Sequence, residues 1–263
     1  MRRLFVFCVS LLLLSCWLPV LSQQAGLQTA SPVSRIEPPS PSAPVDELET
    51  RGDELRRVKA YVDSIAYYRA AIAKEKSAVL YNKVGISELQ LDRLSNARKD
   101  FNRAIKLDKT YAEAYNNLGV IYYTQKKYGS AKKQYKKAID LRDSASFHSN
   151  LGSAYFAEKK YDIAAIEYGK ALQLDPDIFE RTSSAGISAR LQSPADKAQF
   201  SYVLARMYAQ MGSFDRSFKY LQKAMEDGYD VKGNIYKDEY FAKLREDARF
   251  TELMAAKTVA VPE

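Results

Sequence analysis

The stretch from residue 112 to residue 141 shows the clearest pattern of hydrophobic and polar positions in the chain. In its first half, apolar or small residues recur at steps of three and four, at Tyr115, Leu118, Gly119 and Tyr122. The second half repeats this spacing, at Ala131, Tyr135 and Ala138. Such steps place side chains on one face of an α-helix, so each half is predicted to be one amphipathic helix. Residues 126–130 are too few and too polar for anything but a helix–helix turn.

The same pattern recurs along the chain. Four glycines are spaced 33, 34 and 33 residues apart, at Gly52, Gly85, Gly119 and Gly152. A small residue follows each glycine by 12 positions, at Ser64, Ala97, Ala131 and Ala164. Four positions later comes an aromatic residue, at Tyr68, Phe101, Tyr135 and Tyr168. An alanine follows three positions after that, at Ala71, Ala104, Ala138 and Ala171. Four columns in register over four units indicate an internal repeat.

These columns resemble the tetratricopeptide repeat, a helix-turn-helix unit of about 34 residues with the signature W-x2-L-G-x2-Y, then A-x3-F, then P. The unit 145–178 matches it at Leu151, Gly152, Tyr155, Ala164, Tyr168, Ala171 and Pro176. The two units before residue 112 depart from the signature. The unit 78–111 has Glu88 where an aromatic residue is usual, and the unit 45–77 has Arg51 where leucine is usual. The resemblance implies stacked helical hairpins that bind protein partners.

The register breaks after Pro176 and resumes at Ala205, 53 residues after Gly152. We interpret residues 179–197 as an insert, either a functional loop or a solvated connection, with a helix starting at Ser193. The prediction is therefore an all-α fold, a right-handed α-solenoid of about five helix-turn-helix hairpins with a C-terminal helical cap. The hairpins are predicted at 45–77, 78–111, 112–144, 145–178 and 198–231, and the cap at 232–257.

The N-terminus has the pattern of a secretory signal over residues 1–22. Arg2 and Arg3 precede an apolar run that extends to Leu21, and cleavage is expected before Gln23. An uncleaved signal-anchor helix is one alternative. A second is lipidation of Cys16, because residues 13–16 resemble a bacterial lipoprotein processing site. The expected address is periplasmic or secreted, or a membrane-anchored lipoprotein.

Composition adds few constraints. Residues 23–44 are rich in proline and serine and are predicted to be a disordered linker. Both cysteines, Cys8 and Cys16, lie in the signal, so a chain cut after residue 22 must be stabilised by packing and not by disulfides. The net charge is +8, or +6 without Arg2 and Arg3. This moderately basic balance suits ordinary solubility.

The sequence offers no chemistry for catalysis. His148 is the only histidine and stands where the repeat usually has a bulky packing residue, so we expect it in the core. No phosphate-binding loop or paired-cysteine motif occurs, and the carboxylates are expected to be scattered mostly over helix surfaces and loops. No catalytic residue, metal or cofactor is predicted.

The first helix of each hairpin is expected to line a concave groove. Six residues there form the candidate peptide-binding set, namely Asn82, Asn116, Asn117, Tyr123, Asn150 and Phe156. Asn117 and Asn150 are expected to stack as a ladder whose amides bind a peptide backbone, while the two aromatic residues hold apolar side chains. Asparagine in these positions for local structural reasons is the alternative. The carboxylate clamp of chaperone-binding family members is not supplied, since Ile86 and Ser146 occupy two of its positions.

A basic stripe is expected on the convex side. Its members are Arg98, Lys99, Arg103, Lys132, Lys133, Lys136 and Lys137. It is interpreted either as a solvated face or as a surface that attracts anionic lipids. Nucleic acid is not an expected partner. The leading hypothesis is a non-enzymatic scaffold that binds a protein or extended peptide in the groove, as an adaptor in an envelope complex. The alternative is a lipid-anchored, membrane-associated assembly factor that uses the basic stripe.

Overall fold

The computed structural model describes residues 37–181 and 193–255. The predictions for the signal segment, for Cys16, for most of the linker and for the centre of the insert lie outside the described residues. The chain divides into two units, residues 1–37 and 38–263, and the helices described below all belong to the second. None of the described helices is long and apolar enough to cross a membrane.

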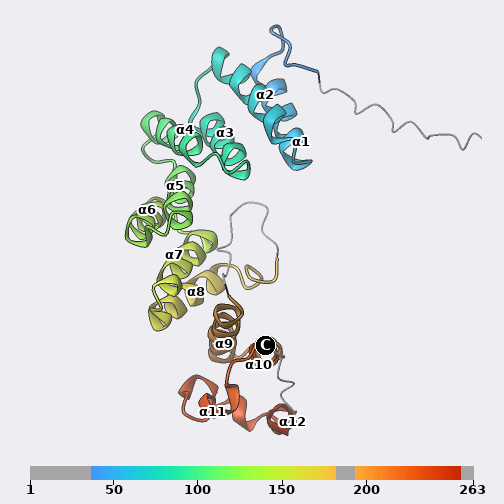
Figure 1. Ribbon diagram of the computed structural model, residues 1–263, viewed down its shortest axis with the longest axis vertical. Helices are drawn as coiled ribbons and strands as arrows, with labels where there is room; N and C mark the ends of the chain where they lie inside the picture. The colour runs from blue at the N-terminus through green and yellow to red at the C-terminus, as the bar shows by residue number, and fades with distance from the viewer. Residues whose placement is uncertain (1–36, 182–192, 256–263) are drawn as a thin grey trace, which may run out of the picture. The chain divides into compact units, whose positions relative to one another are not determined.

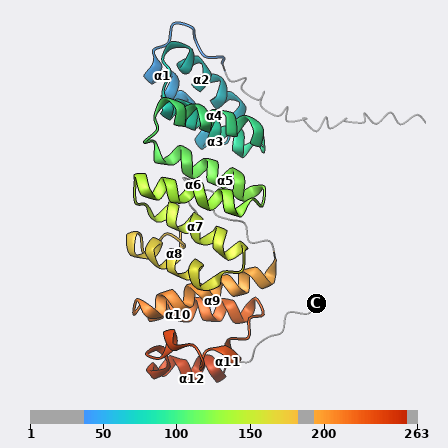
Figure 2. The ribbon, with the colours of Figure 1, turned by 90° about the vertical axis from the view of Figure 1, so that its left-hand side faces the viewer.

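Ten helices of the described chain form five consecutive pairs, and Figures 1 and 2 show these pairs following one another. The pairs are α1 (Val45–Arg57) with α2 (Tyr61–Lys74), α3 (Ala78–Gln90) with α4 (Leu94–Leu107), α5 (Ala112–Thr124) with α6 (Tyr128–Leu141), α7 (Ala145–Ala157) with α8 (Tyr161–Leu174), and α9 (Pro194–Gln210) with α10 (Phe214–Glu226). No strand occurs between residue 37 and residue 255 outside the gap at 182–192. The all-α solenoid of helix-turn-helix pairs is thus confirmed.

In each of the first four pairs, an aromatic ring of the second helix packs against a glycine of the first helix. A Cβ atom added to Gly52, Gly85 or Gly119 would lie 2.5 Å from a ring carbon of the aromatic residue sixteen positions later. At Gly152 the corresponding distance is 2.7 Å. All four rings are fully buried, so they cannot swing away. In the fifth pair Ala205 takes the glycine's place, and the smaller Leu221 takes the place of the ring.

The five turns within the pairs also share one conformation. Seven positions after the glycine or its replacement, the backbone enters the left-handed region, with φ of 64° at Lys59, 57° at Asp92, 58° at Lys126, 61° at Lys159 and 75° at Gly212. The next N–H donates to a carbonyl five residues back, over 2.9 to 3.0 Å. This pattern ends a helix and satisfies a free carbonyl. Equivalent turns therefore set equivalent angles between paired helices.

Successive pairs contact each other through the second helix of one pair and the first helix of the next. Tyr68, for example, packs on Gly52 in its own pair and also on Leu80 and Val84 of α3. First helices touch directly as well, α3 with α5 and α5 with α7. We call the side formed by α1, α3, α5, α7 and α9 the first-helix face, and the side formed by α2, α4, α6, α8 and α10 the second-helix face.

The ends of the described chain pack onto the helix pairs. The predicted linker was expected to reach residue 44, but Ala43 is buried in the cluster that contains Leu48 and Tyr68. At the other end lie α11 (Val231–Asn234), η1 (Glu239–Phe241), η2 (Leu244–Glu246) and α12 (Ala248–Ala255). Their apolar residues join the core cluster of α9 and α10, at Val231, Phe241, Leu244 and Phe250. The capping role of this segment stays a prediction.

The start of α9 is the helix start predicted from Ser193. Its hydroxyl accepts a hydrogen bond from the Asp196 N–H at 3.1 Å and donates one to the Asp196 carboxylate at 2.8 Å. Pro194 occupies the first helical turn, where a missing N–H is harmless. On the other side of the gap, Phe179 packs edge-on against Tyr168 and Phe200. The described ends of the insert are thus attached to the helix pairs.

The ring-on-glycine contact predicts the effect of one added methyl group. Gly119→Ala should lower the free energy of unfolding by about 1–3 kcal/mol, because Tyr135 has no room to retreat. Gly129→Ala is the matched control, since a Cβ there meets nothing within 4 Å and the residue lies in helix α6. This control should gain a few tenths to about 1 kcal/mol. Urea unfolding measures both, and equal stability of the two variants would contradict the packing account.

Candidate functional site

The four asparagines predicted to be exposed on the first-helix face are buried. Asn82, Asn116, Asn117 and Asn150 are each 4 to 9% exposed. The prediction of an open asparagine ladder is therefore wrong, because the direct contact of neighbouring first helices covers these side chains.

The asparagines instead form a chain of hydrogen bonds that crosses three helix pairs. Asn150 donates to Asn116 at 2.8 Å, and Asn116 donates to Asn117 at 3.3 Å. Asn117 donates to Asn82 at 2.9 Å, and Asn82 donates to the hydroxyl of Tyr111 at 3.4 Å. Asn150 thus pairs with Asn116 and not, as predicted, with Asn117. The amides of Asn82, Asn116 and Asn117 each serve as both donor and acceptor, and Asn150 donates, so hydrogen bonds within the protein compensate for the burial of these polar groups.

The two aromatic residues of the predicted groove differ from each other. Phe156 is buried, with its ring 5.1 Å from that of Tyr161 and 5.9 Å from that of Phe200. It belongs to the core between α7, α8 and α9, so the prediction that its side chain is exposed in the groove is wrong. Tyr123 is half-buried against Tyr128, with ring centres 5.4 Å apart, and burial raises the pKa of its hydroxyl to about 12. Only Tyr123 of the six predicted residues keeps an accessible side chain.

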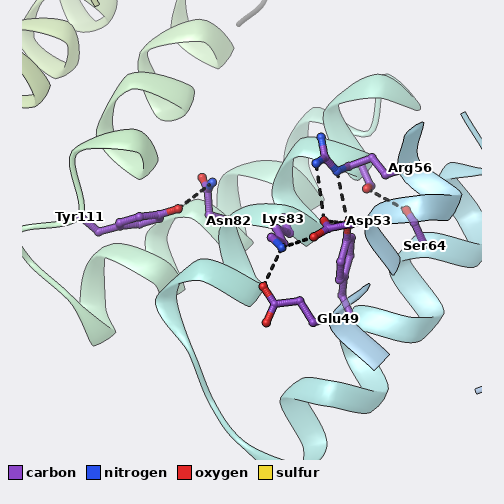
Figure 3. A network of polar contacts seen from close by, with 9 residues as sticks. Glu49, Asp53, Arg56, Ser64, Asn82, Lys83 and Tyr111 are labelled. Atoms are coloured by element: carbon purple, nitrogen blue, oxygen red, sulfur yellow. Dashed lines mark hydrogen bonds and ion pairs between the residues drawn. The ribbon is translucent and has the colours of Figure 1, made fainter. Parts of the chain in front are cut away.

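A second polar network closes the first-helix face between α1 and α3 (Figure 3). The ammonium group of Lys83 donates to Glu49 at 2.6 Å and to Asp53 at 2.5 Å. Tyr68 donates to the other Asp53 oxygen at 2.7 Å, and Arg56 donates to the Tyr68 hydroxyl at 3.2 Å. Burial alone would raise the pKa of Asp53, but the hydrogen bonds from Lys83 and Tyr68 outweigh it and lower the pKa. Charges on this part of the face are thus paired internally.

An open cleft lies at the other end of the first-helix face. It has a volume of about 700 Å³ and is formed by the turn before α8, one side of α9, and the segment from α11 to η1. Its accessible rim carries cations, carboxylates and tyrosines, at Lys159, Lys160, Tyr161, Asp162, Lys237, Glu239 and Tyr240. Sequence analysis missed this cleft. We call it the Arg206 cleft.

Arg206 organises the back of this cleft and is itself only 16% exposed. Its Nε lies 2.8 Å from a carboxylate oxygen of Asp238, as an ion pair without the alignment of a hydrogen bond. Its guanidinium carbon lies 4.5 Å from the ring centre of Tyr240. Tyr202 donates to the same Asp238 carboxylate at 3.2 Å and stacks on Tyr229 with ring centres 4.3 Å apart. Burial, followed by the charge of Asp238, raises the pKa of Tyr202.

A sequence signal for the cleft exists at one repeat position. The residue after the glycine or its replacement is Asp53, Ile86, Val120 and Ser153 in the first four pairs. In the fifth pair it is Arg206, the one cation in this column. The remaining lining comes from three separate segments, which the repeat pattern does not bring together.

His148 is buried, as predicted, but its partners are charged. Nδ1 lies 2.6 Å from Glu167 and Nε2 lies 2.8 Å from Asp143. Glu167 and Asp100 are themselves buried carboxylates, and Asp100 pairs with Arg69 at 2.6 Å. These buried carboxylates are exceptions to the expectation that carboxylates lie mostly on helix surfaces and loops. Across the described residues no group of histidine, cysteine, aspartate and glutamate has an arrangement that could hold a metal ion.

The predicted basic stripe lies on α4 and α6, and six of its seven members are exposed, namely Arg98, Lys99, Arg103, Lys133, Lys136 and Lys137. Lys132 does not point outward as predicted. Its ammonium group donates to Glu158 at 2.5 Å and lies 4.8 Å from the centre of the Tyr155 ring. Hydrogen bonds from Lys132 and Lys160 lower the pKa of Glu158. Lys132 thus joins two helix pairs.

Helix pairs that repeat and pack in sequence define an α-solenoid, a class of protein that typically serves as a protein–protein interaction scaffold. Profiles described as "TPR repeat" at residues 85–126 and as "Tetratricopeptide repeat" at 112–144, 145–178 and 198–226 match the chain. The chain is a tetratricopeptide repeat protein. The fifth pair, at 198–226, is included in this assignment despite the insert before it.

Curated relatives share short stretches of the chain. Hsp70-Hsp90 organizing protein 2 of Arabidopsis thaliana is 25% identical over 96 residues, which cover 36% of this chain and 17% of that protein. The chloroplastic tetratricopeptide repeat domain-containing protein PYG7 of the same plant is 33% identical over 92 residues, with coverages of 33% and 31%. The chain thus spans less than a third of the length of these relatives.

Two solved structures resemble the fold. The pilF protein of Pseudomonas aeruginosa has a TM-score of 0.54 at 16% identity, over 81% of this chain and 97% of that one. A thermophilic tetratricopeptide repeat protein of Thermus thermophilus has a TM-score of 0.50 at 17% identity, over 76% and 98%. At these identities the similarity concerns the fold alone.

The network of Figure 3 predicts a pH dependence of stability. Asp53 has a pKa below the usual 3.8, so its stabilising contribution is present above that pH and is lost as the pH falls through the lower folded-state value. Asp53→Asn should lower the free energy of unfolding by about 1 kcal/mol at about pH 7, and by much less near about pH 3. Denaturant titrations at both pH values measure this difference.

The control for this experiment is Asp140→Asn, which removes an exposed carboxylate near the end of α6. It should change stability little at either pH. If Asp53→Asn lowers the free energy of unfolding equally at both pH values, the charge of Asp53 does not contribute to stability.

Proposed function

We propose that this chain is a non-enzymatic scaffold that binds an extended segment of a protein partner in the Arg206 cleft and acts as an adaptor. The observation that carries the proposal is the contrast along the first-helix face. Between α1 and α7, Lys83 is bound to Glu49 and the asparagines are bound to one another, whereas at α9 a cleft of about 700 Å³ is open. The proposal therefore places peptide binding at the α9 end of the predicted concave groove.

The rim of the Arg206 cleft suits a peptide. Aromatic rings such as Tyr161 and Tyr240 offer apolar faces with a hydrogen-bonding end. Lys159 and Lys237 can donate to backbone carbonyls or carboxylates, while Asp162 and Glu239 can accept from backbone N–H groups or cations. A few placed polar groups around apolar surface are typical of sites that orient an extended segment.

The relatives support the general role. Several carry names that describe them as organizing proteins for Hsp70 and Hsp90, and they match this chain over its repeats. A carboxylate clamp in the usual family position is not part of the proposal. Asn150, at a third clamp position, is already hydrogen-bonded to Asn116, and Ile86 and Ser146 lack the required groups.

The adaptor is proposed to work outside the cytoplasm, on the evidence of the sequence at residues 1–22. Intact-mass measurement of the chain produced in a bacterial host tests this address. We expect a mature chain that starts at Gln23, because the basic and apolar regions precede a suitable cleavage site. A start at Cys16 with a lipid mass would replace this proposal by the lipid-anchored alternative. A full-length chain would contradict processing altogether.

Filling the cleft tests the binding proposal. The full chain is used to select binders from a library of random peptides displayed on phage, and selected peptides are then titrated against variants. Gln199→Trp places a large ring among the cleft-lining residues of α9. It should weaken the peptides at least about tenfold, or roughly 1.4 kcal/mol.

Thr124→Trp is the matched control, because Thr124 is exposed at the end of α5 on the same face and lies away from the cleft lining. Peptides should bind it as they bind the unaltered chain. Equal affinity for the Gln199 variant, or loss in the control alone, would contradict the placement of the site in the Arg206 cleft. Thermal unfolding of both variants checks that each remains folded.

A further inference from the structure

The second-helix face carries cations that no carboxylate neutralises. Arg98 and Lys99 on α4, and Lys133, Lys136 and Lys137 on α6, are exposed and form no ion pair within the described residues. We call these five residues the outer basic face. Elsewhere in the same residues many cations are paired across helices, as Lys83 is with Glu49 and Arg142 is with Glu113. Other exposed cations of the described chain are also unpaired, but these five lie together on two second helices of neighbouring pairs.

The acids of these two helices do not offset this charge. Asp100 is the only acidic residue of α4, but it is 1% exposed and is held by Arg69 and Arg103. Asp140 is the only acidic residue of α6 and lies in its last turn. An approaching partner therefore meets a field of one sign along α4 and α6.

On α8, exposed isoleucines lie at or beside the repeat positions that carry lysines on α4 and α6. Lys99, Lys133 and Ile166 occupy equivalent positions of three successive second helices, 34 and 33 residues apart. Ile166 is 58% exposed, and Ile163 one turn earlier is 42% exposed. Lys170 follows on the same helix at the position equivalent to Lys137 and is also exposed. Cations on two helices thus border apolar side chains on the third.

From this arrangement we infer that the second-helix face of α4, α6 and α8 docks onto an anionic lipid surface. Cations near such a surface are attracted to its headgroups, each strengthening binding about fivefold. An apolar side chain beside them can enter the boundary between headgroups and acyl chains, where burial of its surface is favourable. A nucleic acid backbone would use the cations but has no comparable place for Ile166. The lipid surface is the partner that uses both features.

This inference goes beyond the proposed peptide binding, which concerns α9 and its neighbours on the first-helix face. A scaffold with both surfaces could hold a partner beside a membrane without a spanning helix. The five cations of the outer basic face are absent from the lining of the Arg206 cleft, so the two activities can be separated by substitution.

Sedimentation with lipid vesicles tests the inference on the full chain. Vesicles of phosphatidylcholine alone are compared with vesicles containing roughly one-third phosphatidylglycerol, at low and high salt. The chain should bind the anionic vesicles, and high salt should weaken this binding. Reversal of three charges together, by Lys133→Glu, Lys136→Glu and Lys137→Glu, should reduce the partition constant more than about tenfold. Ile166→Ser should reduce it a few-fold at either salt concentration.

The control reverses three exposed lysines elsewhere, by Lys74→Glu, Lys223→Glu and Lys243→Glu, for the same change in net charge. It should keep most of the vesicle binding. Equal binding to neutral and anionic vesicles, or equal losses in the two triple variants, would overturn the inference. The inference would also be overturned if the unaltered chain did not bind anionic vesicles but bound polyglutamate or duplex DNA through the same lysines. Peptides selected on the Arg206 cleft should bind the Lys133, Lys136 and Lys137 variant normally, which keeps the two proposals distinguishable.

Discussion

The contact between a buried aromatic ring and a glycine sixteen residues before it sets the geometry of this protein. A side chain on Gly52, Gly85 or Gly119 would overlap the ring, so the paired helices lie closer together than any larger residue at these positions would allow. Because the same contact and the same left-handed turn recur, each pair presents nearly the same surfaces to the next pair. The repeated residues therefore pack the helices together, and the residues between them are the ones available for binding.

Close approach also decides what happens to the polar residues of the first helices. Where α3, α5 and α7 touch, the asparagines between them are cut off from water and must satisfy one another. Lys83, Asp53 and Glu49 also bind one another between α1 and α3, although their side chains stay partly exposed. The fifth pair follows after 53 residues instead of 33 or 34, and the segment that follows it folds back over α9. The irregular stretch of the chain is thus where a cleft opens, with Arg206 at its back.

The fold could be predicted from the sequence because the residues that pack its helix pairs recur at fixed spacings along the chain. Glycine, small residue, ring and alanine recur at fixed spacing, and such columns have one common explanation in packing. The site could not be predicted in the same way. A helical period places Asn116 and Asn150 on the right face but cannot say whether water or a neighbouring amide binds them. The helical period likewise predicted that Lys132 points outward, because it cannot show that Glu158 of the next pair binds this lysine. The Arg206 cleft depends on residues from separate segments, whose meeting follows from how the chain returns after α10.

The central claim is that the asparagines of the first-helix face are buried against one another from α3 to α7, whereas the face is open for binding at α9. Hydrogen exchange of side-chain amide groups, followed by NMR, tests it most directly. Asn82, Asn116, Asn117 and Asn150 should exchange slowly, because each amide is buried and hydrogen-bonded. Asn102 on α4 and Gln90 at the end of α3 are exposed and should exchange at the rate of free amides. Exchange of the four asparagines as fast as that of Asn102 would contradict the account, because the face would then be open along its length.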